Sequence, residues 1–333
     1  MNMKTLRKNK IIIFSILALL LLIGGSIIII PKLMGAQDCT SVEKYDFYRD
    51  ECYFMCDSNE QCDALSQKVN QELNEYFSDT QTKASAAKPI SPKASDNGNL
   101  YTLKSTGSET KGTVYTVRNG VLQPEPSQDN KRLWNLVNTL IGTQNAQDHI
   151  ASFEVFDDEN NDTAASVWRS DNNASKWHMN LNAAFSGQDK KDLIKTIVHE
   201  YGHIVTLSGD QVGAVSGACP RVELDEGCGT GDSYINAYYN KFWKDYDFGA
   251  DAVGSISEDE AAALYKTEPS SFVSEYASTN ISEDIAESFA DFVTKSKPAD
   301  TAIKSQKVRF FYQYPELVTL REQMRAAAAK VIL

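Results

Sequence analysis

The stretch Lys195-Thr-Ile-Val-His-Glu-Tyr-Gly-His-Ile-Val-Thr-Leu207 decides how the rest of the sequence is read. His199 and His203 are four residues apart, so on a helix they project from one face about one turn from each other. Two such imidazoles can hold a single ion. Apolar residues recur around them at helical spacing, which predicts a buried helix with its histidines facing a cleft. They are Leu193, Ile194, Ile197, Val198, Tyr201, Ile204 and Val205.

Glu200 follows the first histidine directly, so it is aimed at a water on the ion rather than at the ion itself. The chain has only four histidines, and chance rarely gives two of them this spacing. Bound zinc lowers the pKa of water to about 7, and a carboxylate at this position can take the proton and pass it to a leaving amine. The pattern predicts peptide hydrolysis with one zinc ion per chain.

A catalytic zinc site needs a third protein ligand and an open position, whereas a structural site closes with four ligands. Glu283, Glu287 and Asp291 recur at four-residue steps in a second helical pattern, and one of them could supply the third ligand. A solvated acidic face is the alternative. A structural zinc site would need a fourth ligand such as Asp291. The other side of this helix is apolar, with Ile285, Phe289 and Phe292.

Three segments together resemble the gluzincin-type peptidases related to the anthrax lethal factor catalytic domain and the bacterial Pro-Pro endopeptidases. They are the His-Glu-Tyr-Gly-His motif at 199–203, Ser-Glu-Tyr-Ala-Ser-Thr-Asn at 274–280 and Glu-Asp-Ile-Ala-Glu-Ser-Phe at 283–289. In that family a tyrosine lies seven residues before the third zinc ligand, and Tyr276 and Glu283 have this separation. The resemblance covers about residues 150 to 325.

The resemblance implies a role for each of three residues. Glu283 would be the third ligand beside His199 and His203, Tyr276 would supply a hydroxyl to the oxyanion, and Glu287 would be a carboxylate next to a ligand histidine. The segment between His203 and Glu283 departs from the pattern, because it is far longer than in lethal factor. Substrate preference therefore does not carry over.

The fold is expected to be α+β and zincin-like. A small twisted sheet would pack on the motif helix, with a mainly helical C-terminal half. Strand patterns lie at 114–121, 153–156 and 177–181, and a helical pattern lies at 131–141. The strand at 177–181 is read as an edge strand able to pair with an extended substrate. Ser186 and Asp189 form a capping-box pattern that opens the motif helix. The helical half would bury Phe310, Phe311, Tyr312 and Leu317.

All six cysteines follow the hydrophobic N-terminal segment, in the compartment where disulfides persist. Cys219 and Cys228 are expected to form a disulfide whose short loop contributes roughly 2.7 kcal/mol. The other four allow three pairings, and a metal knuckle is disfavoured because no histidine accompanies them. These four are Cys39, Cys52, Cys56 and Cys62.

The chain is expected to have an N-terminal anchor. Residues 11–30 carry no charge and would span about 30 Å as a helix, and the basic segment 1–10 before them would remain in the cytoplasm. A cleaved signal peptide, with a mature form beginning near Gln37, is the alternative. Beyond the anchor we expect a small cysteine-bearing region (38–77), a linker (78–111) and the zinc metallopeptidase domain (112–333), all outside the cytoplasm.

The formal net charge of −12 argues against nucleic acid as a partner, because phosphate backbones would be repelled. The acidic loop 157–162 does not match a calcium loop, since Thr163 stands where glycine is needed. The expected function is an extracytoplasmic zinc endopeptidase acting on a protein or peptide. The rival is an inactive zinc-binding surface adhesin or interaction protein, whose mark would be replacement of Glu200 or Tyr276. Neither is replaced.

Overall fold

The protein is described from a computed structural model. Two compact units divide the chain, Met1–Leu65 and Ser66–Leu333, called here the N-terminal unit and the larger unit. The predicted basic segment and anchor, and all of the predicted linker except Ser78, lie outside the described residues. No described helix has the length and apolar character needed to cross a membrane. The described residues are 43–46, 51–54, 59–78, 112–161, 163–186, 190–214, 218–245 and 256–332.

In the N-terminal unit two short strands form an antiparallel pair. β1 (Glu43–Asp46) pairs with β2 (Glu51–Phe54), so that Tyr45 lies opposite Cys52. Helix α3 (Asn59–Ser78) begins in this unit and continues into the larger one.

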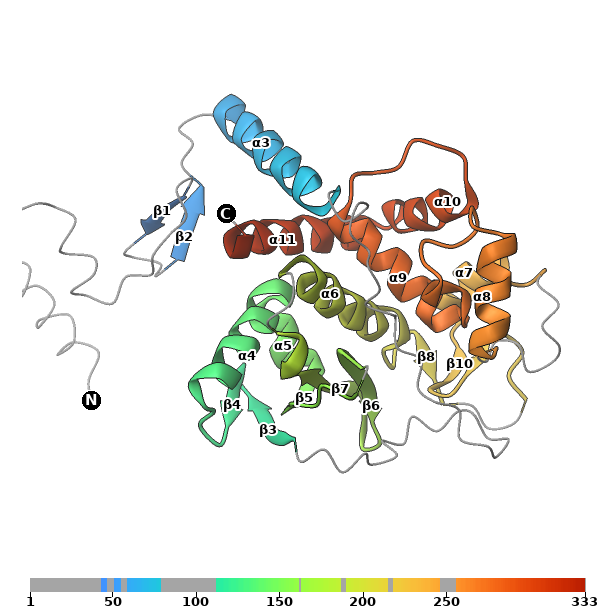
Figure 1. Cartoon of the computed structure of the whole chain (residues 1–333), viewed down its shortest axis with the longest axis horizontal. Helices are drawn as coiled ribbons and strands as arrows, with labels where there is room; N and C mark the ends of the chain where they lie inside the picture. Colours follow the sequence, from blue (N-terminus) through green and yellow to red (C-terminus); the bar gives the residue numbers. More distant parts are fainter. Residues whose placement is uncertain are drawn as a thin grey trace, which may run out of the picture. The chain divides into compact units, whose positions relative to one another are not determined.

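The larger unit contains a five-stranded mixed sheet with the order β4-β3-β5-β7-β6. The central strands β5 and β7 are parallel, and the other neighbours are antiparallel. Figure 1 shows the sheet beside the green and olive helices α4, α5 and α6. The strands are β3 (Thr113–Arg118), β4 (Val121–Gln123), β5 (Ile150–Phe156), β6 (Ala165–Ser170) and β7 (Asn173–Asn182).

Helices make up the rest of the larger unit, together with a small three-stranded sheet of order β8-β10-β9. This confirms the predicted α+β class. The helices are α4 (Gln128–Ile141), α5 (Thr143–His149), α6 (Lys190–Leu207), α7 (Tyr234–Phe242), α8 (Glu258–Thr267), α9 (Ile281–Thr294), α10 (Ile303–Phe310) and α11 (Pro315–Ile332). Short 3-10 turns are η2 (Ala183–Phe185), η3 (Tyr276–Ser278) and η4 (Phe311–Gln313), and the small strands are β8 (Val212–Gly213), β9 (Glu223–Leu224) and β10 (Gly227–Gly229).

Strand β7 is internal, so the prediction that 177–181 forms an edge strand was wrong. β6 pairs with the outer side of β7 and forms one edge of the sheet, with β4 at the other. The sequence does not predict a strand at 165–170, because its apolar and polar residues alternate only weakly. In the structure Val167 alone in β6 is buried. β6 also packs against α6.

A tight turn divides the predicted strand 114–121 into the β3–β4 hairpin. Asn119 (φ 52°) and Gly120 (φ 73°) occupy the left-handed region that a two-residue hairpin of this kind requires. The indole of Trp134 on α4 donates to the carbonyl of Gly120 and packs on Phe153 of β5, with ring centroids 5.2 Å apart. These contacts seat α4 on the sheet.

The edge strand is also connected to the end of the motif helix. Arg169 of β6 donates to the carbonyls of Leu207, Val212 and Glu226. The first of these is the last residue of α6, where carbonyls otherwise lack partners. Just beyond it, Cys219 and Cys228 are joined by a disulfide, as predicted.

The C-terminal half is mainly helical, as expected from the sequence. Phe310, Phe311 and Leu317 are buried, whereas Tyr312 is half-buried. Arg325 of α11 donates to the side chains of Asn70 and Asn74 and to the carbonyl of Val293. The second half of α3 is therefore bonded to α11 within the larger unit.

Candidate metal centre

Helix α6 buries the His-Glu-x-x-His motif along with its apolar residues. His199 is 6% exposed, Glu200 7% and His203 9%. The apolar residues around them are also buried, except for Val205, which is half-buried. Polar groups this deep are costly unless they have partners. The partners of the two histidines come from the facing helix, α9.

Helix α9 lies close enough to α6 to meet these partners because Gly202 has no side chain. A Cβ atom at Gly202 would lie 3.1 Å from Cδ1 of Phe289 and 3.3 Å from Cα of Ala286. At the start of α9, the Asn280 side chain accepts a hydrogen bond from the backbone N–H of Glu283 at 2.8 Å. This cap fixes the first turn and directs Glu283 toward the histidines.

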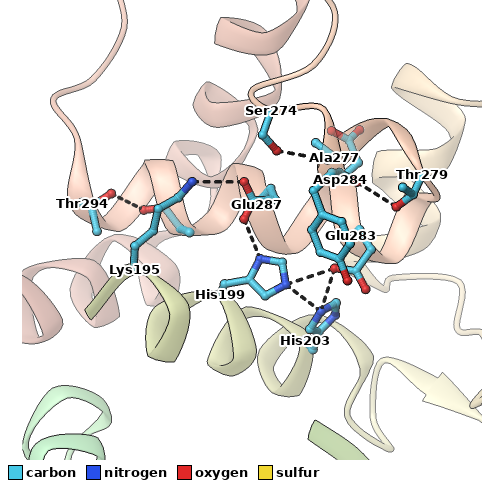
Figure 2. Close-up of polar contacts among 12 residues, drawn as sticks. Lys195, His199, His203, Ser274, Ala277, Thr279, Glu283, Asp284, Glu287 and Thr294 are labelled. Carbon is cyan, nitrogen blue, oxygen red and sulfur yellow. Dashed lines mark hydrogen bonds and ion pairs between the residues drawn. The ribbon is translucent and has the colours of Figure 1, made fainter. Parts of the chain in front are cut away.

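Three side-chain atoms converge where the two helices meet (Figure 2). Oε2 of Glu283 lies 3.0 Å from Nε2 of His199 and 3.3 Å from Nε2 of His203, and the two nitrogens are 3.1 Å apart. Three ligands of a tetrahedral zinc ion, with bonds of about 2.0–2.1 Å, are separated by about 3.3 Å. The spacing therefore matches the trio that such an ion would bind.

Buried Oε2 of Glu283 also lacks a hydrogen bond of normal geometry, although both histidine nitrogens are near. A buried carboxylate oxygen whose hydrogen bonds are poorly aligned is costly. A cation placed among the three atoms would satisfy it, so these residues fit a divalent metal. Within the described part of the chain, His199, His203 and Glu283 form the only group of this kind.

Protons and a cation compete for this cluster. Burial lowers the pKa of His199, but the carboxylates of Glu283 and Glu287 outweigh it and raise that pKa well above the ordinary value. Burial raises the pKa of Glu283, yet His203 and His199 outweigh it and hold that pKa far below the ordinary value. Without a cation, His199 therefore carries the positive charge, and metal binding should release its proton.

Glu287 fixes the orientation of the first histidine. Its Oε1 lies 2.9 Å from Nδ1 of His199, and its Oε2 accepts from Nζ of Lys195 at 3.1 Å (Figure 2). Burial raises the pKa of Glu287, but Lys195 and His199 outweigh it and hold that pKa well below the ordinary value. An anion at this position favours a proton on Nδ1, which leaves Nε2 free to bind a metal.

The two residues expected to act on substrate also lie at this cluster. Burial raises the pKa of Glu200, with the positive charge of His199 acting in the opposite direction. The Tyr276 ring lies 5.9 Å from the ring of His199, between centroids. Burial raises the Tyr276 pKa well above its ordinary value, and the charges of Glu283 and Glu200 add to this effect. Tyr276 is therefore a neutral hydroxyl, able to donate a hydrogen bond.

Other residues considered from the sequence lie elsewhere. Asp291 is paired with Lys295 at 2.8 Å and is outside the three-residue group, so it does not supply the fourth ligand of a closed site. His178 is 2.6 Å from Oγ of Ser152. His149 lies near the Tyr201 hydroxyl at 3.5 Å.

Sequence reasoning missed two groups behind the site. One is Lys195, which stands one turn before His199 on the same helix and bonds Glu287. Its four-residue spacing from His199 was the available signal. The other is a fully buried ion pair between Asp284 and Lys307, 2.6 Å apart. Nothing in the sequence places these two side chains together, because they come from different helices.

Comparison of the chain with protein-family models, with curated proteins and with solved structures finds no match.

Proposed function

We propose that this protein is a zinc-dependent endopeptidase. The observation that carries the proposal is the convergence of His199, His203 and Glu283, at separations suited to zinc, beside a buried glutamate and a neutral tyrosine. Three protein ligands leave a position open, which is typical of catalytic zinc. The resemblance to gluzincin-type peptidases, and with it a zincin-like fold, belongs to the same proposal.

When bound, zinc polarises the substrate carbonyl and lowers the pKa of water. His199, His203 and Glu283 would hold the ion, and Glu287 keeps the ring of His199 in place. Glu200 accepts a proton from the attacking water and then gives it to the leaving amine, so that the peptide C–N bond breaks.

Tyr276 donates a hydrogen bond from its hydroxyl to the carbonyl oxygen as negative charge develops there. Its raised pKa supports this role, because the group stays protonated at neutral pH. Edge strand β6, which packs on α6, is the place where an extended peptide would pair with the sheet. The β7 segment at 177–181 lies between two strands and does not serve this purpose.

The alternative of an inactive surface adhesin requires metal ligands without catalytic groups. Glu200 and Tyr276 are both retained at the cluster, which supports the enzyme. The N-terminal anchor, and with it a position outside the cytoplasm, remains part of the proposal. Protease added to intact cells should reach the larger unit, whereas a soluble form beginning near Gln37 would establish a cleaved signal peptide.

The test of the function is the purified full chain, loaded with zinc and incubated with a peptide library, with cleavage sites mapped by mass spectrometry. The wild type should hold about one zinc and cut internal peptide bonds. Glu200→Gln should keep the zinc and lose activity by at least about 10²–10⁴-fold, because an amide cannot accept the proton. A zinc-loaded wild type that cuts nothing, or a Glu200→Gln chain as active as wild type, would overturn the proposal.

A further inference from the structure

Helices α6 and α9 face each other with basic groups on one and acidic groups on the other. Along α6, Lys195, His199 and His203 are one turn apart. Along α9, Glu287 and Glu283 are also one turn apart. Lys195 bonds Glu287, His199 lies between Glu287 and Glu283, and His203 meets Glu283.

Glu287 directs each of its two oxygens at a different basic partner in this arrangement, and Ser274 also bonds its carboxylate. Oε1 faces Nδ1 of His199 at 2.9 Å, and Oε2 accepts from Nζ of Lys195 at 3.1 Å (Figure 2). A carboxylate that accepts a bond on each oxygen from opposite directions cannot rotate without losing one of them. The ammonium group thus orients the carboxylate that orients the histidine.

From this geometry we propose that Lys195 is a positioning residue for the metal centre, which holds Glu287 against His199 so that Nε2 of His199 is presented to the ion. The inference rests on the proposed function, because it assigns a role within the same site. Lys195 does not reach the three ligand atoms itself. It acts through Glu287.

Lys195 is suited to this role by its surroundings. Burial lowers the pKa of its ammonium group, but Glu287 and Asp291 outweigh burial and raise that pKa above the ordinary value. The group therefore remains charged. Its side chain is 35% exposed while that of Glu287 is 11% exposed, so the bond forms away from bulk water at the Glu287 end. An ordinary exposed ion pair contributes little stabilisation. The role of Lys195 therefore depends on the partial burial of its bond to Glu287.

The experiment is a double-mutant cycle on zinc affinity, measured by chelator competition on the full chain. Lys195→Met should weaken zinc binding by roughly 10-fold, the lower end of what loss of a partner behind a ligand costs. Lys195→Arg keeps the charge and should stay within about 3-fold of wild type. In a Glu287→Gln background, Lys195→Met should change the affinity by less than about 2-fold, because the group it acts through is already altered.

Lys266→Met provides the matched control, since it removes the same charge from an exposed position on α8. Its zinc affinity should equal that of wild type. If Lys195→Met binds zinc as tightly as wild type, or loses as much affinity in the Glu287→Gln background as alone, the positioning role is overturned. Rescue by arginine separates positioning from misfolding.

The same samples distinguish this inference from the proposed function. A wild type that binds zinc but cleaves no peptide overturns the function and leaves the cycle to decide the role of Lys195. A wild type that binds no zinc overturns both. If the wild type cleaves peptides and Lys195→Met does not change the zinc affinity, the inference alone is overturned.

Discussion

The two faces of helix α9 each bury carboxylates, yet they balance the negative charge differently. On the face toward α6, Glu283 meets two histidine nitrogens, and its Oε2 has no hydrogen bond of normal geometry. On a second face, about 100° around the helix, Asp284 meets Nζ of Lys307 at 2.6 Å and accepts from Trp243 at 2.7 Å and Tyr238 at 3.1 Å. Adjacent residues in the chain thus have opposite surroundings.

The difference separates a site for an ion from a structural pair. The chain itself supplies the cation for Asp284, and both side chains of that pair are 0% exposed. Glu283 has two imidazoles and the Tyr276 hydroxyl beside it. An imidazole binds a metal only when the facing nitrogen carries no proton. In the first arrangement the chain itself supplies the cation, whereas the second would be completed by an added one.

Removing the ligand carboxylate should have the largest effect. Glu283→Ala should abolish stoichiometric zinc binding, because two imidazoles alone form an incomplete site. Glu287→Ala is the matched change one turn away and should weaken affinity or activity by about 10- to 100-fold. Metal content by mass spectrometry together with a cleavage assay measures both. Full zinc in Glu283→Ala with loss in Glu287→Ala would mean that the third ligand is one helical turn away from its assigned place.

Breaking the pair between Asp284 and Lys307 should affect folding rather than zinc stoichiometry. Lys307→Met should lower the free energy of unfolding by about 3–5 kcal/mol, because the buried carboxyl of Asp284 loses its basic partner. The double change Asp284→Asn with Lys307→Met should cost less, since the amide can still accept from Trp243 and Tyr238. Urea unfolding measures this. Zinc loss from folded Lys307→Met, with unfolding unchanged, would contradict the division between the faces.

A smaller effect is expected for the hydroxyl beside the ion site. Tyr276→Phe should keep one zinc per chain and lose about 10²–10³-fold in kcat, because an oxyanion donor is removed while the ligands stay. Steady-state kinetics beside metal content measures this change. An unchanged kcat would remove Tyr276 from the proposed mechanism and leave the metal assignment intact.

The smallest effect is expected for Asp225, a carboxylate that has neither a lysine nor a histidine partner among the ion pairs of the described residues. Asp225 is exposed, yet partial desolvation, with the nearby charge of Glu226, raises its pKa from 3.8 to about 6. Because the folded pKa is the higher one, stability is lost as pH rises from about 4 to 6. Asp225→Asn should therefore raise the melting temperature slightly at pH 7 and not at pH 4. Thermal unfolding at both pH values tests this, and equal differences at the two would contradict the assignment.

The sequence predicted the elements that depend on local periodicity. The strand pattern at 153–156, the end of the motif helix at Leu207 and the helical C-terminal half lie where the spacing indicated. The predicted capping box is not seen among the described residues: the Ser186 hydroxyl donates to the carbonyl of Ala183 at the end of η2, and Asp189 lies outside the described residues. The meeting of His199, His203 and Glu283 was also expected, from four-residue spacing and from a family resemblance. The structure brings these three side chains together.

What the sequence could not supply depends on contacts between distant segments. The edge position of β6 depends on which strand pairs outermost, and alternation within a strand does not record this. Likewise, the pairing of Asp284 with Lys307 requires α10 to fold behind α9. Lys195 was within reach of the helical argument, but its role depends on a partner from α9.

The close approach at Gly202 sets the distance between α6 and α9, and with it the size of ion that the three ligand atoms can share. Zinc bonds are about 2.0–2.1 Å long, whereas calcium needs about 2.3–2.6 Å and more oxygen atoms. Glycine within a helix costs about 1 kcal/mol of helix propensity relative to alanine. Because the methyl group is absent, the helices lie close together and the three ligand atoms are spaced for a small ion. A Gly202→Ala chain, with its helices pushed apart, should lose preference for zinc over the larger cadmium ion.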